Sequence, residues 1–454
     1  MSADLGAACN PLHVAIVGSG PSGFYAAEAL FKLPCAVQVD MLEALPVPFG
    51  LVRYGVAPDH PKLKQPIQVF DGIARAPGFQ FFGNVPVGRD VTVEDLQRTH
   101  HAILFAYGAG DDRRLGIEGE DLAGSHSARE FVGWYNGHPD DRDRRFDLSC
   151  EVAVVIGQGN VAVDVARILA RPVHELRGTD IAEHALEPLA ASRVREIHIV
   201  GRRGPAQAKF TSKELRELGE LTGCSVEVSA DDLVLGAACR EELADKHNYV
   251  AAKNLEIFQS WTGPRAGSAG KRIVFHFLRM PVSLGGRERL ETIALERGAL
   301  RGAPFSQTVA GSGSVESLSC GLLFRSIGYR GRALNGLPFD AQQGVLPHEG
   351  GRVGDCAGVY AAGWIKRGPS GIIGTNRADA VATVASLMSD LPRLDPAPKA
   401  GGAGLRAALA RRGTRIVGYQ DWLRLDAIEV ERGARAGKPR EKMTRVGEML
   451  AALQ

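Results

Sequence analysis

Two segments of the chain show the same order of residue types: a short run of small apolar residues, then glycines, then an apolar pattern with helical spacing. They are HVAIVGSGPSGFYAAEALFKL at residues 13–33 and CEVAVVIGQGNVAVDVARILA at residues 150–170. An apolar run bounded by glycine predicts a buried strand, and the pattern that follows predicts a helix packed on that strand. Each segment is therefore predicted to form a strand, a turn and a helix, and the presence of two such units predicts two dinucleotide sites.

The remaining segments continue the alternation of strands and helices. A loop rich in proline and glycine (46–64) is followed by a helical stretch and a predicted strand, HAILFAYGAG (101–110). After the second unit come charged helical stretches, a Gly/Ser-rich connection near residue 310 and a predicted strand, GLLFRSIGY (321–329). From about residue 390 a Pro/Gly-rich start leads into basic sequence with helical character. The whole pattern predicts an α/β fold.

The first glycine motif, GxGxxG, consists of Gly18, Gly20 and Gly23 and lies between the predicted strand and helix. Glycines there allow a tight turn, a close approach of the backbone to a diphosphate and close packing of the helix on the sheet. The next predicted strand, VQVDMLE, ends in Glu43, 20 residues after Gly23, where an acid can bond ribose hydroxyls. A carboxylate at this point repels a 2′-phosphate, so the first site is predicted to bind FAD or NAD rather than NADP.

The second motif, GxGxxA, consists of Gly157, Gly159 and Ala162. The next strand is delayed by an insertion at about 171–192, and it ends in the sequence GRRGP without an acid. The strand end therefore differs in charge from that of the first unit.

The two arginines of this strand end, Arg202 and Arg203, are candidates for binding the 2′-phosphate of NADP. The planar guanidinium bonds phosphate oxygens in pairs and keeps its charge at any physiological pH. Glu214, in the sequence TSKELREL, is a candidate for the adjacent ribose. One FAD-like and one NADP-like site in a single chain predict a flavoprotein in which hydride passes from nicotinamide to flavin.

The composition limits the class of protein and agrees with a flavoprotein that has two nucleotide sites. The chain has 454 residues, of which 44% are hydrophobic and 23% charged, which is ordinary for a globular protein of two or three domains. The net charge of +2 gives no indication of nucleic-acid binding. No apolar run approaches the roughly 18–20 residues that span a bilayer, and the first residues resemble no signal peptide, so a cytoplasmic protein is expected. No two of the seven cysteines have CxxC spacing, which argues against zinc, iron–sulfur ligation and a redox-active disulfide.

Several motifs together resemble the adrenodoxin reductase family of NADPH-dependent ferredoxin reductases, with a bacterial member expected. They are GSGPSGFYAAE, PFGLVRYGVAPDHPKLK, FFGNVPVGRDVTVEDL, SAREFVGWYNG, DLSCEVAVVIGQGNVAVDVARILA, GRRGPAQAKFTSKELREL, GWIKRGPSGIIGTN and GKPREK. The resemblance runs from about residue 12 to the C-terminus and is weakest at 225–315.

This resemblance implies two Rossmann-like, three-layer domains with the NADP domain inserted into the FAD domain. The implied boundaries are 1–108 and 325–454 for the two parts of the FAD domain and 109–324 for the NADP domain. Beside the motif glycines, the implied FAD contacts are Ser22, Glu43, Leu51, Val87, Trp364, Gly371, Ile372 and Ile373. The implied NADP contacts are Gln158, Gly159, Asn160, Val161, Arg202, Arg203, Glu214 and Gly371.

The family also suggests a pair, His60 and Asp164, for moving a proton or ordering water, although hydride transfer to flavin requires no side-chain acid. A structural or orienting role for the pair therefore stays open beside a catalytic one. The implied partner is an acidic iron–sulfur ferredoxin, and a monomer is expected. The vertebrate members carry an Arg-rich helix where this chain has REELADKHNYVAAKN, which weakens the expectation of the same partner.

Several alternatives share the two nucleotide motifs. One is a subunit of a larger NADPH-dependent synthase, although such chains typically add an N-terminal cysteine-rich cluster domain, which is not expected here. A disulfide reductase would need a cysteine pair near the flavin, which the sequence lacks. A flavin monooxygenase, or a reductase of a quinone or another non-ferredoxin acceptor, is not excluded by glycines alone. A non-catalytic nucleotide sensor would keep both folds but would not let NADPH reduce its flavin.

Overall fold

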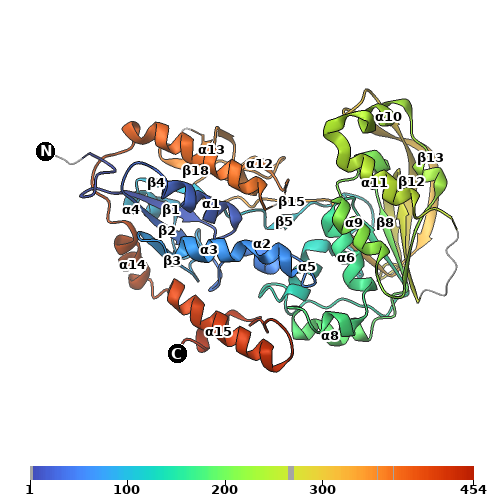
Figure 1. Ribbon diagram of the computed structural model, residues 1–454, viewed down its shortest axis with the longest axis horizontal. Helices are drawn as coiled ribbons and strands as arrows, with labels where there is room; N and C mark the ends of the chain where they lie inside the picture. The colour runs from blue at the N-terminus through green and yellow to red at the C-terminus, as the bar shows by residue number, and fades with distance from the viewer. Residues whose placement is uncertain (1–3, 264–269, 355, 372) are drawn as a thin grey trace. The chain divides into compact units, whose positions relative to one another are not determined.

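The computed structural model describes residues 4–263, 270–354, 356–371 and 373–454. The chain forms two compact units, which are described separately (Figure 1). The first unit consists of Met1–Asp112 and Gly328–Gln454, and the second unit consists of Arg113–Ile327. The first unit is therefore built from both ends of the chain, which is why blue and orange segments share one sheet in Figure 1.

A seven-stranded sheet forms the centre of the first unit, in the order β16-β17-β18-β4-β1-β2-β3. The strands from β18 to β3 are parallel, and β16 and β17 add antiparallel pairs at one edge. The strands are β1 Leu12–Val17, β2 Val37–Leu42, β3 Phe79–Phe82, β4 Ala102–Phe105, β16 His348–Glu349, β17 Arg352–Val353 and β18 Val359–Ala361. A separate antiparallel pair joins β5 Asp111–Asp112 and β15 Tyr329–Arg330.

Helices cover both faces of this sheet. Successive residues of a strand point to opposite sides, and in β1 the side chains on both sides are apolar and buried. Val14 and Ile16 of β1 pack with α1 Pro21–Leu30, α3 Pro66–Ala74, α13 Thr375–Asp390 and α15 Tyr419–Arg435. Ala15 and Val17 pack with α4 Val93–Thr99 and α14 Gly401–Arg411 on the other face. The remaining helices are α2 Gly50–Tyr54, α12 Trp364–Arg367 and α16 Val446–Ala451.

The second unit has a parallel sheet in the order β6-β14-β7-β8-β10-β9. The strands are β6 Ser125–Ser127, β14 Leu322–Arg325, β7 Val152–Ile156, β8 Glu196–Val200, β10 Lys271–His276 and β9 Cys224–Val228. One face packs on helices α5 Ala128–Asn136, α6 Asn160–Ala170, α7 Val173–Leu176, α8 Glu183–Ala190, α9 Ser212–Gly219 and α11 Tyr249–Gln259, and α10 Ala237–Ala244 precedes α11. The other face is covered by an antiparallel sheet, β11 Arg279–Gly285, β12 Thr292–Arg301 and β13 Thr308–Ser319.

Three local expectations from the sequence differ from the structure. The Gly/Ser-rich stretch near residue 310 is not a connection but lies in β13, because the exposed edge of an antiparallel sheet accepts small polar residues. The strand expected over 101–110 ends at Phe105, since the chain turns before Gly108, which has a φ of 76°. The strand expected over 321–329 ends at Arg325, ahead of Gly328 with a φ of 100°.

Among the helices that the described residues form, none combines the length and apolar character that a membrane crossing requires. In the same part of the chain, no group of three or more His, Cys, Asp or Glu side chains is placed to hold a metal ion.

Candidate functional site

The first glycine turn joins β1 to α1 in the first unit. Gly23 must lack a side chain, because a Cβ there would lie 2.1 Å from the carbonyl oxygen of Gly18. Gly20, the residue before α1, has no atom within 4 Å of a Cβ built on it, and no side chain caps the helix. The turn therefore leaves open space beside free backbone N–H groups at a helix N-terminus, which is the arrangement that a diphosphate needs.

Glu43 lies at the end of β2, beside this turn. Its Oε2 accepts hydrogen bonds from the backbone N–H of Ser19 (3.1 Å) and from Ser19 Oγ (2.6 Å), and its Oε1 accepts from the N–H of Leu45 (3.2 Å). The structure thus brings the predicted acid to the predicted glycine motif. The three donors fix the carboxylate at the strand end, where it remains half-buried.

The loop segments of the first unit also converge on this turn. Phe49, just before α2, donates its N–H to Ser19 O at 3.0 Å, so α2 with Leu51 follows directly beside the turn, and Leu51 is 41% exposed. Val85 donates its N–H to Glu43 O at 2.9 Å, which places the segment containing Val87 next to the end of β2.

Trp364 begins α12, and its indole stacks on Tyr329 with ring centroids 5.6 Å apart. Its Nε1 is buried and has no hydrogen-bond partner among the described residues. A buried donor without a partner costs free energy unless a ligand or water satisfies it, so the indole fits a residue that faces a cofactor. Of the later predicted residues, Gly371 is exposed, Ile373 is half-buried, and Ile372 lies outside the described residues.

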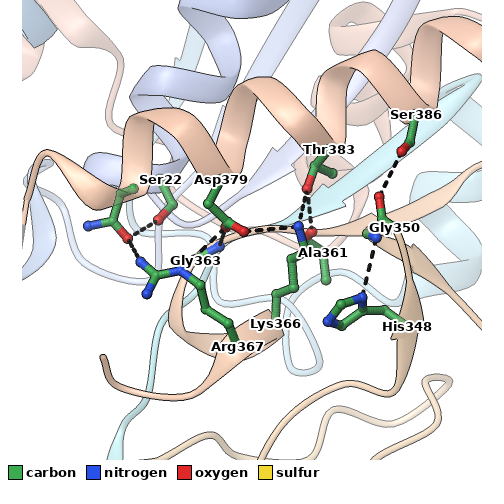
Figure 2. A network of polar contacts seen from close by, with 12 residues as sticks. Ser22, His348, Gly350, Ala361, Gly363, Lys366, Arg367, Asp379, Thr383 and Ser386 are labelled. Atoms are coloured by element: carbon green, nitrogen blue, oxygen red, sulfur yellow. Dashed lines mark hydrogen bonds and ion pairs between the residues drawn. The ribbon is translucent and has the colours of Figure 1, made fainter. Parts of the chain in front are cut away.

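Ser22 is linked to the segment around Trp364 through two side chains that lie in the motif GWIKRGPSGIIGTN but are not among the predicted contact residues (Figure 2). Ser22 Oγ donates to Asn376 Oδ1 at 3.0 Å, and Arg367 Nη2 donates to the same oxygen at 2.7 Å. Asp379 of α13 pairs with Arg367 and also accepts a hydrogen bond from Lys366 of α12, which extends the network. The only signal in the sequence is the pair of cations in GWIKRG, and an exposed basic turn gives the same pattern.

The second glycine turn joins β7 to α6 in the second unit. A Cβ on Gly157 would lie 2.1 Å from Ser326 O, whereas a Cβ on Gly159 would meet no atom within 4 Å. Ala162 is fully buried under the turn. As in the first unit, open space lies beside an uncapped helix N-terminus, here that of α6.

The loop after β8 folds back onto this turn. Gln158 donates its Nε2 to Arg203 O at 3.0 Å, and its carbonyl accepts from the N–H of Lys209 at 2.7 Å. Asn160 Oδ1 accepts from the N–H of Thr211 at 2.9 Å, and Thr211 Oγ1 donates to Glu214 Oε2 at 2.7 Å. The structure therefore brings the predicted ribose acid and the loop with both arginines to the N-terminal end of α6, where Val161 also lies.

Arg202 and Arg203 themselves are exposed, and neither guanidinium makes a hydrogen bond or ion pair within the described ranges. Nearby, His198 Nδ1 and His276 Nε2 are 2.7 Å apart. Burial lowers the pKa of His276 to about 4, with a smaller contribution from the neighbouring His198, and burial lowers the pKa of His198 as well. These imidazoles are neutral at pH 7, so the positive charge at this strand end belongs to the arginines.

The suggested proton-handling residues lie in different units. His60 precedes the short 3-10 helix Pro61–Lys64 and is half-buried. Asp164 lies on α6, where its Oδ1 accepts a hydrogen bond from the fully buried Arg167 at 2.6 Å. That ion pair gives Asp164 a structural role of its own.

Comparison with known proteins gives near full-length relatives, although no family model matches. The chain is 44% identical over 453 residues to human mitochondrial NADPH:adrenodoxin oxidoreductase, covering 97% of this chain and 92% of the relative. It is 43% identical over 452 residues to NADPH-ferredoxin reductase FprA of Mycobacterium tuberculosis, covering 97% and 98%. The solved structure of M. tuberculosis FprA in complex with NADPH superposes with a TM-score of 0.93 at 42% identity, covering 98% of this chain and 99% of that one.

Proposed function

The chain belongs to the NADPH:adrenodoxin oxidoreductase family, and on that basis we propose which of its residues hold the two coenzymes. As a member it is a flavoprotein oxidoreductase that binds FAD, uses NADPH and passes electrons to a ferredoxin. When bound, the flavin accepts hydride from NADPH and releases electrons singly. The protein's own task is to hold each coenzyme and to distinguish one from the other.

In the first unit, the turn at Gly18, Gly20 and Gly23 holds the FAD diphosphate, and Glu43 bonds its ribose. The open space over Gly20 and the carboxylate fixed beside it support this assignment. The other residues proposed to contact FAD are Ser22, Leu51, Val87, Trp364, Gly371, Ile372 and Ile373. For Trp364 the support is the buried indole N–H, which finds no partner within the described ranges.

In the second unit, the turn at Gly159 receives the diphosphate of NADPH, and Arg202 and Arg203 bind its 2′-phosphate. The observation that carries this proposal is a pair of exposed guanidinium groups at the end of β8, which have no partner among the described residues and lie beside an open helix N-terminus. The other residues proposed to contact NADP(H) are Gln158, Asn160, Val161, Glu214 and Gly371. The unit 113–327 is thus the NADP domain inserted into the FAD domain.

The pair His60 and Asp164 is proposed to order water or a proton rather than to take part in hydride transfer. The electron acceptor in this proposal is an acidic ferredoxin. The protein itself is proposed to be a monomer in the cytoplasm. The exposed Lys246 and Lys253 can attract an acidic protein, and they are fewer than the arginines of the vertebrate members.

An anaerobic titration tests the function. We expect NADPH, and NADH only weakly, to bleach the flavin band at about 450 nm of the purified protein, and added ferredoxin to be reduced by one electron. Bleaching without transfer to ferredoxin would redirect the proposal to a quinone or another acceptor. Purified protein that neither carries nor binds flavin would refute it.

A further inference from the structure

The short helix α12, which begins with Trp364, contains a lysine whose ammonium group is buried. The Lys366 side chain is 10% exposed, and its Nζ donates to Asp379 Oδ1 at 2.9 Å and to Thr383 Oγ1 at 3.0 Å. Asp379 is 12% exposed, and it lies four residues before Thr383 on one face of α13. Figure 2 shows this ammonium group between the helix and the end of β18.

Each partner of Lys366 is bonded in turn to the backbone next to Trp364. Asp379 Oδ2 accepts the N–H of Gly363 at 2.5 Å, and Gly363 directly precedes the tryptophan. Thr383 Oγ1 donates to Ala361 O at 3.0 Å, at the end of β18. The ion pair therefore joins three elements, β18, α12 and α13, at the point where the chain turns into the indole.

A buried ion pair is a poor means of gaining stability alone, because desolvation of both charges offsets much of their attraction. Apolar side chains could fill the same space at similar stability. What an ion pair with further hydrogen bonds adds is a fixed geometry, since each charge must keep its partners in place.

We propose that Lys366 and Asp379 are positioning residues that orient the Gly363 N–H and the Trp364 indole toward the flavin. This inference rests on the proposed function, since it requires FAD in the first unit. Neither residue touches the cofactor in this proposal. Both act through the backbone of Gly363.

The test compares Lys366→Met and Asp379→Asn with Arg352→Met in the full-length flavoprotein. Arg352 pairs with Asp390 on the same helix α13, with Nε 2.6 Å from Oδ2. Its side chain also bonds Ser386 and Ser389 near the end of that helix, and among the described residues it bonds none of residues 361–364. The measurements are the rate of FAD release on dilution, the absorption and circular dichroism of bound flavin, and thermal unfolding of the apoprotein.

We expect both variants to release FAD about tenfold faster and to alter the flavin circular dichroism. The double variant should be no worse than either single variant, because the two groups act as one unit. Arg352→Met should lower thermal stability without changing the flavin spectrum. NADP⁺ binding should be unchanged in all three.

An unchanged flavin spectrum, with FAD release altered no more than in Arg352→Met, would reduce the ion pair to a structural contact and overturn the inference. If Lys366→Met does not fold, Thr383→Val removes one partner of the ammonium group with little change of shape, and an unaltered flavin spectrum there would refute the inference equally. Failure of the proposed function is distinguishable, since wild-type protein would then hold no flavin.

Discussion

At the end of β2 the carboxylate of Glu43 already accepts three hydrogen bonds from the chain, whereas at the end of β8 two exposed guanidinium groups have no partner in the part of the chain that the structure describes. The two strand ends otherwise match, because each lies beside an uncapped helix N-terminus with open space over a glycine. The same glycine turn is therefore combined with a negative side chain that the protein itself hydrogen-bonds in one unit, and with positive side chains that it leaves exposed in the other.

The difference corresponds to two kinds of ligand. A carboxylate that its own turn holds in place loses little conformational freedom when a ligand binds, which suits a cofactor that stays bound. Arginines that are exposed and bond no other described side chain keep their hydrogen-bonding capacity for a dianionic phosphate. This suits a coenzyme that must be selected and exchanged at every turnover. We therefore expect the end of β2 to determine how firmly FAD is retained and the end of β8 to determine the preference for NADPH over NADH.

The largest effect is expected from removing both arginines. In Arg202→Ala/Arg203→Ala, the dissociation constant for NADPH should rise by about 10² to 10⁴, because two charge-assisted bonds of about 1.5–3 kcal/mol each are lost. The constant for NADH, which has no 2′-phosphate, should change little. Fluorescence titration with both coenzymes measures the two constants.

Arg195→Ala is the matched control, because Arg195 is an exposed arginine just before the opposite end of β8. It should leave both constants unchanged. Equal losses of NADPH and NADH binding in the double variant would contradict the phosphate role and remove the contrast between the two strand ends.

Filling the open space over the second turn should give the next largest effect. In Gly159→Ala the new methyl group meets no protein atom within 4 Å, so folding should be unaffected. It would occupy the path of the diphosphate, and binding of both NADPH and NADH should weaken by about tenfold, or about 1.4 kcal/mol. Gly178→Ala, equally free of contacts, is the control in the same unit.

This variant separates the two parts of the site. The arginines are expected to act on NADPH alone, and the turn on both coenzymes. A Gly159→Ala protein that binds NADPH normally would mean that the diphosphate lies elsewhere.

Much of this contrast could be predicted from the sequence, because it is local. Each of its signals lies within a short stretch of the chain. These signals are the GxGxxG spacing, the acid 20 residues later and the two arginines that follow the strand sequence EIHIV. The fold class followed from the same units, and the relatives confirm it together with the FAD and NADPH requirement.

What the sequence did not predict depends on contacts between distant segments. The Gly/Ser content near residue 310 predicts a connection, but pairing with β12 makes this segment a strand. Nothing in GWIKRG indicates that Lys366 is buried, since its partners come from α13 and its environment depends on how α12 meets that helix. Side-chain burial of a cation is a tertiary property that a local pattern does not specify.

A smaller effect is expected from neutralising the acid of the first unit. Glu43→Gln keeps one acceptor oxygen and replaces the other with an NH₂ group. In one orientation of the amide both Ser19 donors lose their acceptor, and in the other orientation the Leu45 N–H loses its acceptor. FAD should be released about fivefold faster, for a loss of about 1 kcal/mol, with no change in preference between NADPH and NADH. Glu94→Gln, an exposed acid on α4, is the control. Full retention of FAD by Glu43→Gln in mild denaturant would show that the carboxylate does not hold the ribose.

The smallest effect concerns salt, and it follows from exposure alone. Raising the ionic strength from about 0.1 M to about 1 M shortens the Debye length from about 10 Å to about 3 Å, which screens exposed charges far more than buried ones. NADPH carries the additional phosphate that faces the exposed arginines, so its dissociation constant should rise about threefold more than that of NADH. The Arg202→Ala/Arg203→Ala variant should lose this difference, because the charges that salt screens are gone. If the variant keeps the full salt dependence, then other cations select the phosphate, and the lack of partners at the end of β8 has no functional meaning.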